Sequence, residues 1–346
     1  MLRHVIGATV LVLGGLAAGA ATAEDFYKGK TVTIVTSTGP GGGYDLTARA
    51  IARNMGNFLP GKPGVIVQNM PGGGNVLATN YMYNIAPKDG TVIATINNAM
   101  PLHQALKGKG VRFDARQFNW LGSTGSSNEV VFVWHSTGVR SVDDLKKTQV
   151  VLGGTGPASS IVIFPTAMNN ILGTKFKIVT GYKSSSEIDV VLERGEVLAR
   201  SNSYASLVSK RPQWLSEKKV NILVQVGAKR DKALPDVPLL SELATNDLDR
   251  QTLQLISSPI LMGRPYLAPP KTGADRVADL RKAFQGTMND KAFQGEIKRL
   301  NLDLDPFGGD EVSRVVNDTI NAPEEIIAKA IAAMPKGGAK KKKKKS

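Results

Sequence analysis

Residues 31–45 read TVTIVTSTGPGGGYD, and this stretch decides the class of fold. Thr31 to Ser37 is a short run rich in β-branched residues, which predicts a strand, and a glycine-rich loop follows it directly. Asp45 then opens a pattern in which apolar residues recur at helical spacing. A strand, a glycine-rich loop and a helix in this order are typical of the start of a βαβ unit.

The same order of elements recurs along the chain. Strands alternating with helices predict an α/β protein, and the alternation appears on both sides of a small polar segment at 122–128. We therefore expect two lobes, each a mostly parallel sheet flanked by helices, with a hinge at that segment. A proline-rich region after Val226 should recross between the lobes. Expected boundaries are 24–125 plus 226–335 for lobe 1 and 126–225 for lobe 2.

Both ends of the chain carry segments that we exclude from the lobes. Residues 1–23 have the three parts of a secretory signal peptide: a short positive start, an apolar run, and the small residues Ala21-Thr22-Ala23 before a polar stretch. The apolar run is shorter than the ~20 residues that a membrane span needs. Residues 336–346 are lysine-rich and are predicted to be disordered. Electrostatic tethering to an anionic surface is the alternative role for that tail.

Composition excludes several kinds of site. The 346 residues include no cysteine, which rules out disulfides, thiolate metal sites and cysteine nucleophiles. Three histidines leave little for an imidazole-rich metal site, and we expect neither a metal nor another cofactor. Aromatic residues are only 6% of the chain, so a surface that stacks on nucleic-acid bases is not expected.

Glycine and serine clusters follow four of the expected strands. In open α/β sheets, ligands lie beyond the carboxyl ends of the strands. Glycines let backbone N–H groups approach an anion, and the helix that follows adds partial positive charge. Two such loops in each lobe, facing each other across a cleft, would suit a small carboxylate. The alternative is that the glycines only make tight turns and close packing.

Motifs of competing enzymes are incomplete. Ser216-x-x-Lys219 and a later Lys271-Thr272-Gly273 fit a penicillin-recognising enzyme, but no Ser-Asp-Asn lies between them. A Ser-His-Asp hydrolase would need His103 or His135 as its base, and no G-x-S-x-G motif is present. An enzyme built on a binding-protein scaffold and acting on a small carboxylate stays open as an alternative.

Several segments in fixed order resemble the extracytoplasmic solute receptors of tripartite tricarboxylate transporters, also called the Bug family. The resemblance covers nearly the whole chain after residue 23. It implies a two-lobed periplasmic binding protein of the type II kind, a monomer that carries out no chemistry. Such a protein captures a small organic acid between its lobes and delivers it to membrane permease subunits. The segments are GPGGGYDLTARAIARNM (39–55), VIVQNMPGGGN (65–75), APKDGTVIATINN (86–98), ALPDVPLLSEL (233–243), ADRVADLRKAF (274–284) and GGDEV (308–312).

The resemblance also implies roles for individual residues. The first loop matches well, so Asp45 and the glycines before it inherit a carboxylate-cradling or loop-shaping role. Where many relatives place an aspartate facing the cleft, this chain has Arg200-Ser201-Asn202. We hypothesise that Arg200 shifts preference toward more anionic or bulkier acids; an arginine facing solvent is the alternative. The predicted ligand-binding residues are Thr38, Gly41, Gly42, Asp45, Gly73, Gly74, Asn75, Asn97, Thr155, Gly156, Ser159, Ser160, Lys183, Ser184, Arg200 and Asn202.

Overall fold

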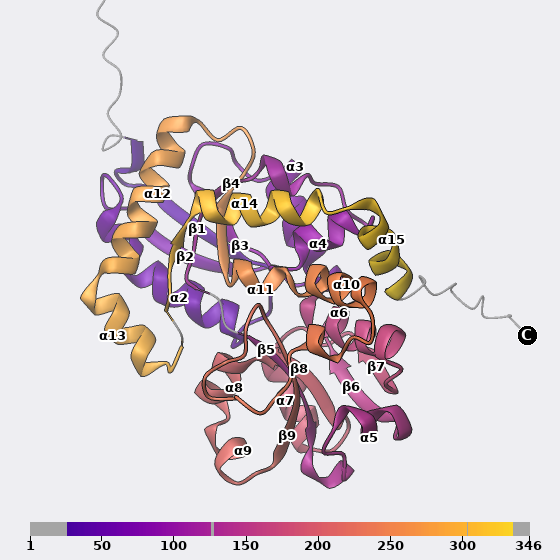
Figure 1. Cartoon of the computed structure of the whole chain (residues 1–346). Coiled ribbons are helices and arrows are strands. Elements are labelled where there is room, and N and C mark those ends of the chain that lie inside the picture. The colour runs from indigo at the N-terminus through magenta and orange to yellow at the C-terminus, as the bar shows by residue number, and fades with distance from the viewer. Residues whose placement is uncertain (1–25, 126–127, 303, 335–346) are drawn as a thin grey trace, which may run out of the picture.

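The computed structural model describes residues 26–125, 128–302 and 304–334, which form two α/β lobes, one above the other in Figure 1. The predicted signal peptide at 1–23 and the lysine-rich tail at 336–346 lie outside the described residues. Each lobe contains one sheet, with helices on both of its faces.

The sheet of the first lobe has the order β11-β4-β10-β3-β1-β2. Strand β1 pairs in parallel on both sides, and its side chains alternate between two apolar clusters, Val32 and Ile34 in one and Val35 in the other. This burial on both faces explains the run of β-branched residues. The strands are β1 (Thr31–Thr36), β2 (Gly64–Asn69), β3 (Val92–Thr95), β4 (Asn119–Ser123), β10 (Pro265–Ala268) and β11 (Phe307–Gly308).

Helices cover the two faces of this sheet in separate groups. The cluster that contains Ile34 also contains residues of α2 (Gly43–Met55), α12 (Ala274–Asn289) and α13 (Lys291–Arg299). The cluster that contains Val35 includes residues of α3 (Val76–Asn84), α4 (Met100–Ala105) and α14 (Gly309–Ile320).

The sheet of the second lobe has the order β7-β6-β8-β5-β9. Its apolar residues also divide between two clusters, one around Phe164 and one around Trp214. The strands are β5 (Glu129–Trp134), β6 (Val150–Gly154), β7 (Phe176–Thr180), β8 (Ala199–Ser203) and β9 (Val220–Val226), and the helices are α5 (Val142–Lys147), α6 (Ser160–Ala167), α7 (Ser185–Glu193), α8 (Tyr204–Lys210) and α9 (Pro212–Ser216).

The predicted two-lobed α/β fold is confirmed, but both sheets are mixed. The strands β1, β2 and β3 are parallel to one another, as are β6, β7 and β8. The strands next to the crossings between the lobes run antiparallel to their neighbours: β4 and β10 in the first sheet and β5 and β9 in the second. Strand β10 lies inside the proline-rich region and was not expected; it begins at Pro265, a position where a strand tolerates proline.

The chain crosses between the lobes in the segment that joins β4 to β5. Strand β4 ends at Ser123 in the first sheet and β5 begins at Glu129 in the second. Within the predicted hinge at 122–128, residues 126–127 lie outside the description. The chain returns between β9 and β10, and this return contains α10 (Asp247–Ser257) and α11 (Pro259–Met262).

The packing of α10 and α15 (Glu324–Ala333) differs from the predicted assignment of 226–335 to the first lobe. These two helices contact each other, and both contact α6 of the second lobe. Leu253, Ile256 and Ala330 join the apolar cluster around Phe164, because α10 and α15 point their apolar sides at α6. The remaining boundaries of the two lobes stay a prediction.

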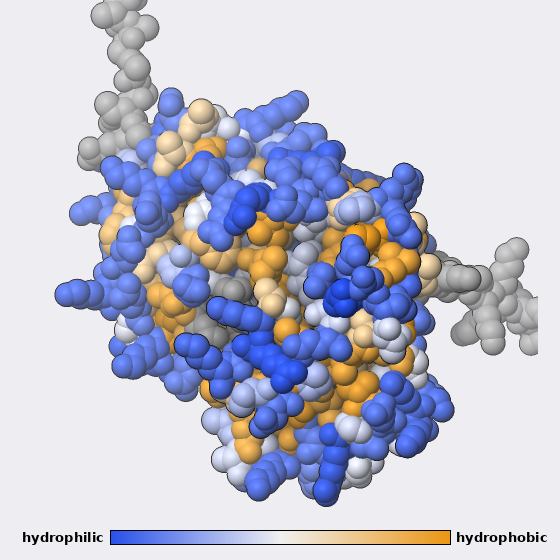
Figure 2. Space-filling view, viewed as in Figure 1, coloured by the Kyte–Doolittle hydropathy of each residue, from blue (hydrophilic) through white to orange (hydrophobic). Residues whose placement is uncertain are grey.

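Figure 2 shows hydrophilic residues over the surface of both lobes, with smaller hydrophobic patches among them. Within the described ranges, no helix combines the length and the apolar character needed to span a membrane. Large hydrophobic side chains that are well exposed include Ile66, Leu77 and Ile85, each more than half exposed.

Candidate functional site

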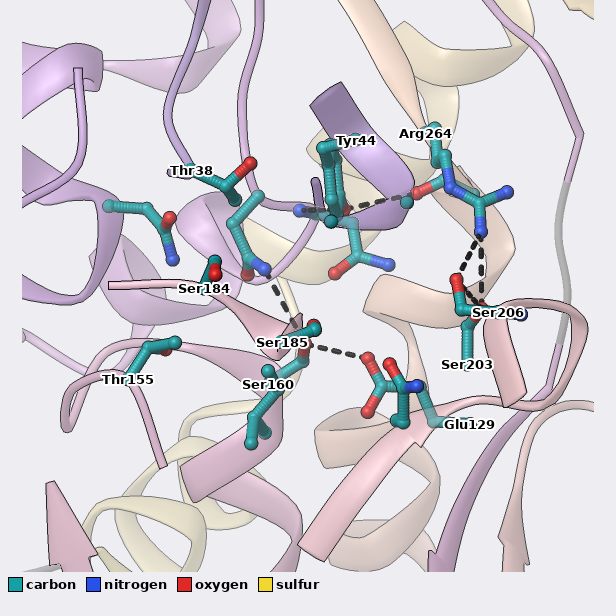
Figure 3. Close-up of a pocket in the computed structure, with 18 of the residues that line it drawn as sticks. Thr38, Tyr44, Glu129, Thr155, Ser160, Ser184, Ser185, Ser203, Ser206 and Arg264 are labelled. Atoms are coloured by element: carbon teal, nitrogen blue, oxygen red, sulfur yellow. Dashed lines mark hydrogen bonds between the residues drawn. The ribbon is translucent and has the colours of Figure 1, made fainter. Parts of the chain in front are cut away.

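A cavity of about 60 Å³, lined mostly by polar residues and glycines, lies between the two lobes. This volume would hold on the order of four or five water molecules, so a ligand that fits it must be small. Segments after β1, β2 and β3 and before β10 contribute to its wall from the first lobe, and segments at or after β5, β6, β7 and β8 contribute from the second (Figure 3).

Three helices begin at the cavity wall. The first residues of α2, α6 and α7 all line it, with Gly43 and Tyr44 from α2 and Ser160 from α6 among them. The N-terminus of a helix has unpaired N–H groups and partial positive charge. Neither α2 nor α6 has a side chain that accepts a hydrogen bond as its N-cap. The backbone of both helices therefore keeps N–H groups for an anion.

Helix α7 is capped by a serine side chain. Ser184 is its N-cap, and its hydroxyl accepts a hydrogen bond from the backbone N–H of Glu187 over 3.3 Å. The Ser184 residue also lines the cavity. This cap fixes where the third helix starts and holds its N-terminus at the wall.

Arg264 is the cation of the cavity. It lies between Gly263 and β10, is only 6% exposed, and donates from Nη2 to the hydroxyls of Ser203 over 3.1 Å and Ser206 over 3.2 Å. In the part of the chain that the structure describes, the guanidinium makes its hydrogen bonds from Nη2 alone. Its Nε and Nη1 groups therefore keep N–H donors for a carboxylate.

Glu129 places a carboxyl group in the same wall. It is the first residue of β5 and is 7% exposed. The hydroxyl of Ser160 donates to Oε1 over 2.7 Å, and the hydroxyl of Ser201 donates to Oε2 over 2.8 Å. Burial raises the pKa of this carboxyl above its ordinary value, although the two hydroxyls, Arg200 and Arg264 act in the opposite direction.

Tyr44 holds two loops of the wall together. Its hydroxyl accepts the backbone N–H of Asn98 over 3.0 Å and donates to the carbonyl of Gly263 over 3.5 Å. Burial raises the pKa of the Tyr44 hydroxyl above its ordinary value, so it stays a neutral phenol. It therefore links α2 to the segments on either side without adding charge.

The two lobes are in direct contact around the cavity. The hydroxyl of Ser186 in the second lobe donates to the carbonyl of Gly41 in the first over 2.9 Å. The amide of Asn97 donates to the hydroxyl of Ser160 across the cavity over 3.5 Å. The structure is therefore the closed arrangement of the two lobes.

The structure brings half of the sequence-predicted ligand residues to the cavity wall. Their role in binding stays a prediction. Residues of the predicted set that line the cavity are Thr38, Gly42, Asn75, Asn97, Thr155, Ser160, Ser184 and Asn202. The others lie behind or beside the wall: Gly41, Asp45, Gly73, Gly74, Gly156, Ser159, Lys183 and Arg200.

Asp45 shapes the first loop. Its carboxylate accepts hydrogen bonds from the backbone N–H of Gly41 over 2.8 Å and from the side chains of Arg49 over 3.0 Å and Asn69 over 2.8 Å. Although burial raises it, these hydrogen bonds bring the pKa of Asp45 below its ordinary value. The oxygens of Asp45 are occupied in this way by the first loop and its neighbours, and Asp45 does not line the cavity.

Arg200 lies behind the wall, not in it. Its side chain is fully buried, pairs with Asp189 and donates from Nη1 to the carbonyl of Ser185 over 2.9 Å. It therefore neither reaches the cavity nor faces solvent, the two alternatives considered from the sequence. Asp189 on α7 pairs with Arg200 and holds it behind the wall. The pattern of the strand that contains Arg200 does not reveal this partner.

Several predicted ligand residues that do not line the cavity make contacts with neighbouring residues. Gly74 and Gly156 lie against each other at the junction of the lobes. The Ser159 hydroxyl donates to the carbonyl of Gly156 over 2.9 Å. Lys183 has an exposed side chain, and its backbone carbonyl accepts from Gly39 over 3.1 Å.

Sequence reasoning missed both charged residues of the wall. Glu129 begins an apolar strand, and Arg264 stands between a glycine and an apolar strand. A charged residue at the edge of a buried run was the signal that could have identified them. The cavity residues outside the predicted set are Gly43, Tyr44, Asn98, Gly125, Glu129, Ile161, Ser185, Ser203, Ser206, Gly263 and Arg264.

The described residues give little support to a histidine base or a metal ion at the cavity. Neither His103 nor His135 lines the cavity. His103 instead lies against the carbonyl of Lys109 at 3.3 Å. Across residues 26–125, 128–302 and 304–334, no group of three or more histidine, aspartate or glutamate side chains is placed to hold a metal ion.

Comparisons with known proteins agree with this architecture. A family model described as the tripartite tricarboxylate transporter family receptor matches residues 47–331. A Cupriavidus necator protein, described as UPF0065 protein in gbd 5'region, is 23% identical over 337 residues, which are 94% of this chain and 95% of that protein.

Solved structures share the fold. The periplasmic binding protein BugD is 20% identical with a TM-score of 0.70, covering 88% of this chain and 98% of its own. MatC from Rhodopseudomonas palustris, solved with bound malate, is 19% identical with a TM-score of 0.69, covering 86% and 98%. A further R. palustris protein, Rpa4515, solved with adipate, is 18% identical with a TM-score of 0.67, covering 88% and 98%.

Proposed function

The chain belongs to the family of tripartite tricarboxylate transporter receptors, and on this premise we propose that it captures a small organic carboxylate in the cavity between its lobes. The bound acid is then delivered to the membrane permease subunits of such a transporter. The protein works in the periplasm as a monomer, after removal of the segment at 1–23.

The observation that carries this proposal is the convergence of positive charge on a small cavity between the lobes. The N-termini of α2, α6 and α7 and the guanidinium of Arg264 all meet there. Partial charges at helix ends and a buried arginine are the groups that proteins use to bind carboxylates. The malate and adipate bound to two R. palustris relatives support this class of ligand.

Closure couples binding to recognition by the permease. The acid first docks on the loops of one lobe, and the second lobe then closes over it. Contacts such as Ser186 to Gly41 form only when the lobes meet. A ligand that touches both lobes therefore shifts the population toward the closed form, and exclusion of water strengthens each charge-assisted hydrogen bond.

An enzyme on the same scaffold is the alternative. The wall contains no histidine that could act as a base for its serines. The hydroxyls of Ser160, Ser203 and Ser206 bond to Glu129, to Arg264 or to one another, and that of Ser184 caps α7. The arrangement supports binding better than covalent chemistry, because a serine nucleophile needs an activating base.

The proposal is tested with a panel of small mono-, di- and tricarboxylic acids. We expect at least one acid to raise the melting temperature of the mature protein and to bind in calorimetry with a stoichiometry of one. The methyl ester of that acid, which lacks the charge, should bind much more weakly. Nuclear magnetic resonance of the acid after long incubation should show it unchanged; turnover would support the enzyme, and a panel without any binding acid would refute the proposal.

A further inference from the structure

We propose that helix α3 and the basic loop beside it form a docking surface for a membrane of anionic phospholipids. This surface combines exposed apolar side chains with unpaired cations, and we call it the α3 surface. Its members are Leu77, Tyr81, Ile85, Lys107, Lys109 and Arg112. None of them lines the cavity between the lobes. The inference therefore goes beyond the proposed function and does not depend on which acid the cavity takes.

The apolar part of the α3 surface runs along one side of the helix. Residues four apart on a helix are neighbours, which places Leu77 next to Tyr81 and Tyr81 next to Ile85. Leu77 is 52% exposed, and Ile85, directly after the helix, is 72% exposed. The opposite side of α3 packs into the core through Ala78 and Met82. The helix therefore presents apolar side chains to solvent although its other side is fully packed.

Hydrogen bonds hold the basic loop against this helix. Nδ2 of Asn80 donates to the carbonyl of Gly110 over 2.9 Å, and its Oδ1 accepts the backbone N–H of Arg112 over 2.9 Å. One turn later, Nδ2 of Asn84 donates to the carbonyl of Arg112 over 2.9 Å. Each asparagine directly precedes a member of the apolar stripe. The loop therefore runs beside the stripe, and cations and apolar side chains are fixed side by side.

The three cations of the α3 surface have no carboxylate of their own. All three are exposed, and none of them takes part in an ion pair among the residues that the structure describes. The only acid in the sequence of 107–116 is Asp114, which Arg116 binds over 2.9 Å. The chain also carries a formal net charge of +15, which attracts it to anionic surfaces. These positive charges are therefore available to an anionic partner.

The chemistry of the α3 surface fits a phospholipid membrane better than a protein. Lysine and arginine near an anionic membrane are attracted to its headgroups, and apolar side chains enter the boundary between headgroups and acyl chains. Tyrosine is enriched at this boundary, because its ring is apolar and its hydroxyl polar. A stable protein interface takes about 20–30 residues on each side, and the α3 surface is far smaller. Its size suits a weak and reversible contact with lipid.

Docking through α3 would also orient the molecule. Asn75, directly before the helix, lines the cavity, and Gly74 lies against Ala158 of the second lobe. The side chain of Leu77 lies against Gly72 in the same loop. The α3 surface therefore begins beside the junction of the lobes. Bound through it, the protein would keep this side of the junction near the membrane, where a permease lies.

The first test measures co-sedimentation of the mature protein with vesicles that contain phosphatidylglycerol. We expect binding that weakens with added salt, and no binding to vesicles of phosphatidylcholine alone. Lys109→Gln with Arg112→Gln should weaken binding by about twentyfold, since each basic residue near an anionic membrane contributes roughly a factor of five. The control pair, Lys175→Gln with Lys177→Gln, removes the same charge at exposed positions of the second lobe and should change binding by about twofold at most. The lysine run at 340–345 is the same in all these proteins.

A second pair of variants tests the apolar stripe. Leu77→Ser should weaken binding to the same vesicles by about fivefold or more, because a leucine that enters the membrane boundary loses its exposure to water. Val190→Ser, at a valine on α7 that is 40% exposed, is the control and should leave binding unchanged. The melting temperature of each variant shows that it is folded.

A fluorescent label locates the contact without relying on a change in affinity. Because the sequence has no cysteine, Ile85→Cys and Val190→Cys each take a single environment-sensitive dye. We expect the emission of the dye at position 85 to shift to the blue on vesicles with phosphatidylglycerol, and that of the dye at position 190 to stay unchanged. A protein held by the lysine run alone would leave both dyes in water.

The outcomes separate the possible partners. Equal losses in the two pairs of charge variants, or a dye at position 85 that stays in water on bound vesicles, would overturn the proposal. If membranes that contain protein capture the chain through the α3 surface while protein-free vesicles do not, the partner is a protein and the lipid proposal is wrong. Binding of acids in solution tests the proposed function separately, and the variants of the α3 surface should leave it unchanged.

Discussion

The backbone N–H of Gly39, in the loop after β1, donates a hydrogen bond to the carbonyl of Lys183, in the loop after β7, over 3.1 Å. The two residues belong to different lobes and lie far apart in the sequence. A main-chain hydrogen bond of this length forms only when the two loops are fixed against each other. Backbone contacts therefore join the side-chain contacts in holding the closed state, and both depend on how closely the loops approach.

Gly156→Ala should hold the lobes apart. A Cβ atom on Gly156 would lie 2.7 Å from both Cα and N of Gly74 in the other lobe, and neither is an atom that can turn aside. We expect ligand affinity to fall by roughly tenfold or more, because overpacking of this kind costs ~1–3 kcal/mol. Calorimetry measures the affinity, and small-angle scattering should show that ligand no longer contracts the variant.

Gly64→Ala is the control for that substitution. Apart from Gly64 itself and its two chain neighbours, no described residue has an atom within 4 Å of the position that its Cβ would take. Affinity and contraction should match the unmodified protein. If Gly156→Ala also closes normally around ligand, tight contact between the two loops does not limit closure.

Arg264→Gln should weaken binding without unfolding the protein. The arginine supplies the only full positive charge among the cavity-lining residues that the structure describes. Removing one partner of a buried charged hydrogen bond costs about 2 kcal/mol or more, which is roughly thirtyfold in affinity. Calorimetry with the acid identified in the panel measures the loss.

A surface arginine separates this effect from a change in net charge. Arg250→Gln on α10 removes an arginine that is 53% exposed, and its ligand affinity should stay unchanged. Equal losses in Arg264→Gln and Arg250→Gln would point to long-range attraction of the anion and would contradict a direct contact.

Sequence patterns identified the loops of the site better than its charges. The hydrophobic periodicity and composition of the sequence predict that Thr38, Asn97 and Ser184 each follow a strand, because the end of a strand is a local property of the chain. Arg264 joins the cavity only through the pairing of β10 between β3 and β4, which no local pattern reveals. The mixed sheets escaped prediction for the same reason, since strand direction is set by the crossings between lobes.

Arg200 should matter for stability and not for ligand contact. Arg200→Met leaves Asp189 buried, with Arg211 as its remaining cationic neighbour at 3.9 Å. Breaking a buried ion pair by removing one partner costs ~3–5 kcal/mol. We expect a loss of this size in the free energy of unfolding from denaturant titration, while the folded fraction keeps its ligand affinity.

The paired variant tests the cause of that loss. Replacing both partners, as Arg200→Met with Asp189→Leu, removes the unpaired buried charge and should recover much of the lost stability. If the double variant is less stable than Arg200→Met, Asp189 has a further role. A large change in ligand affinity in either variant would show that Arg200 contributes to ligand binding after all.

Lys210 should make stability rise with pH above about 8. Its ammonium donates to the hydroxyl of Ser186 over 3.1 Å at the junction of the lobes, and burial lowers the pKa of Lys210 from 10.5 to about 8. Between these values the unfolded chain holds a proton that the folded protein has released, so the free energy of unfolding increases with pH through this window. Below pH 8 the folded protein bears the cost of a buried charge.

Lys210→Met should therefore be relatively more stable at pH 7 than at pH 10.5, measured by calorimetric melting against the unmodified protein. The exposed Lys177→Met on β7 serves as control, and parallel stability curves for Lys210→Met and the unmodified protein would show that the ammonium is not desolvated at this junction.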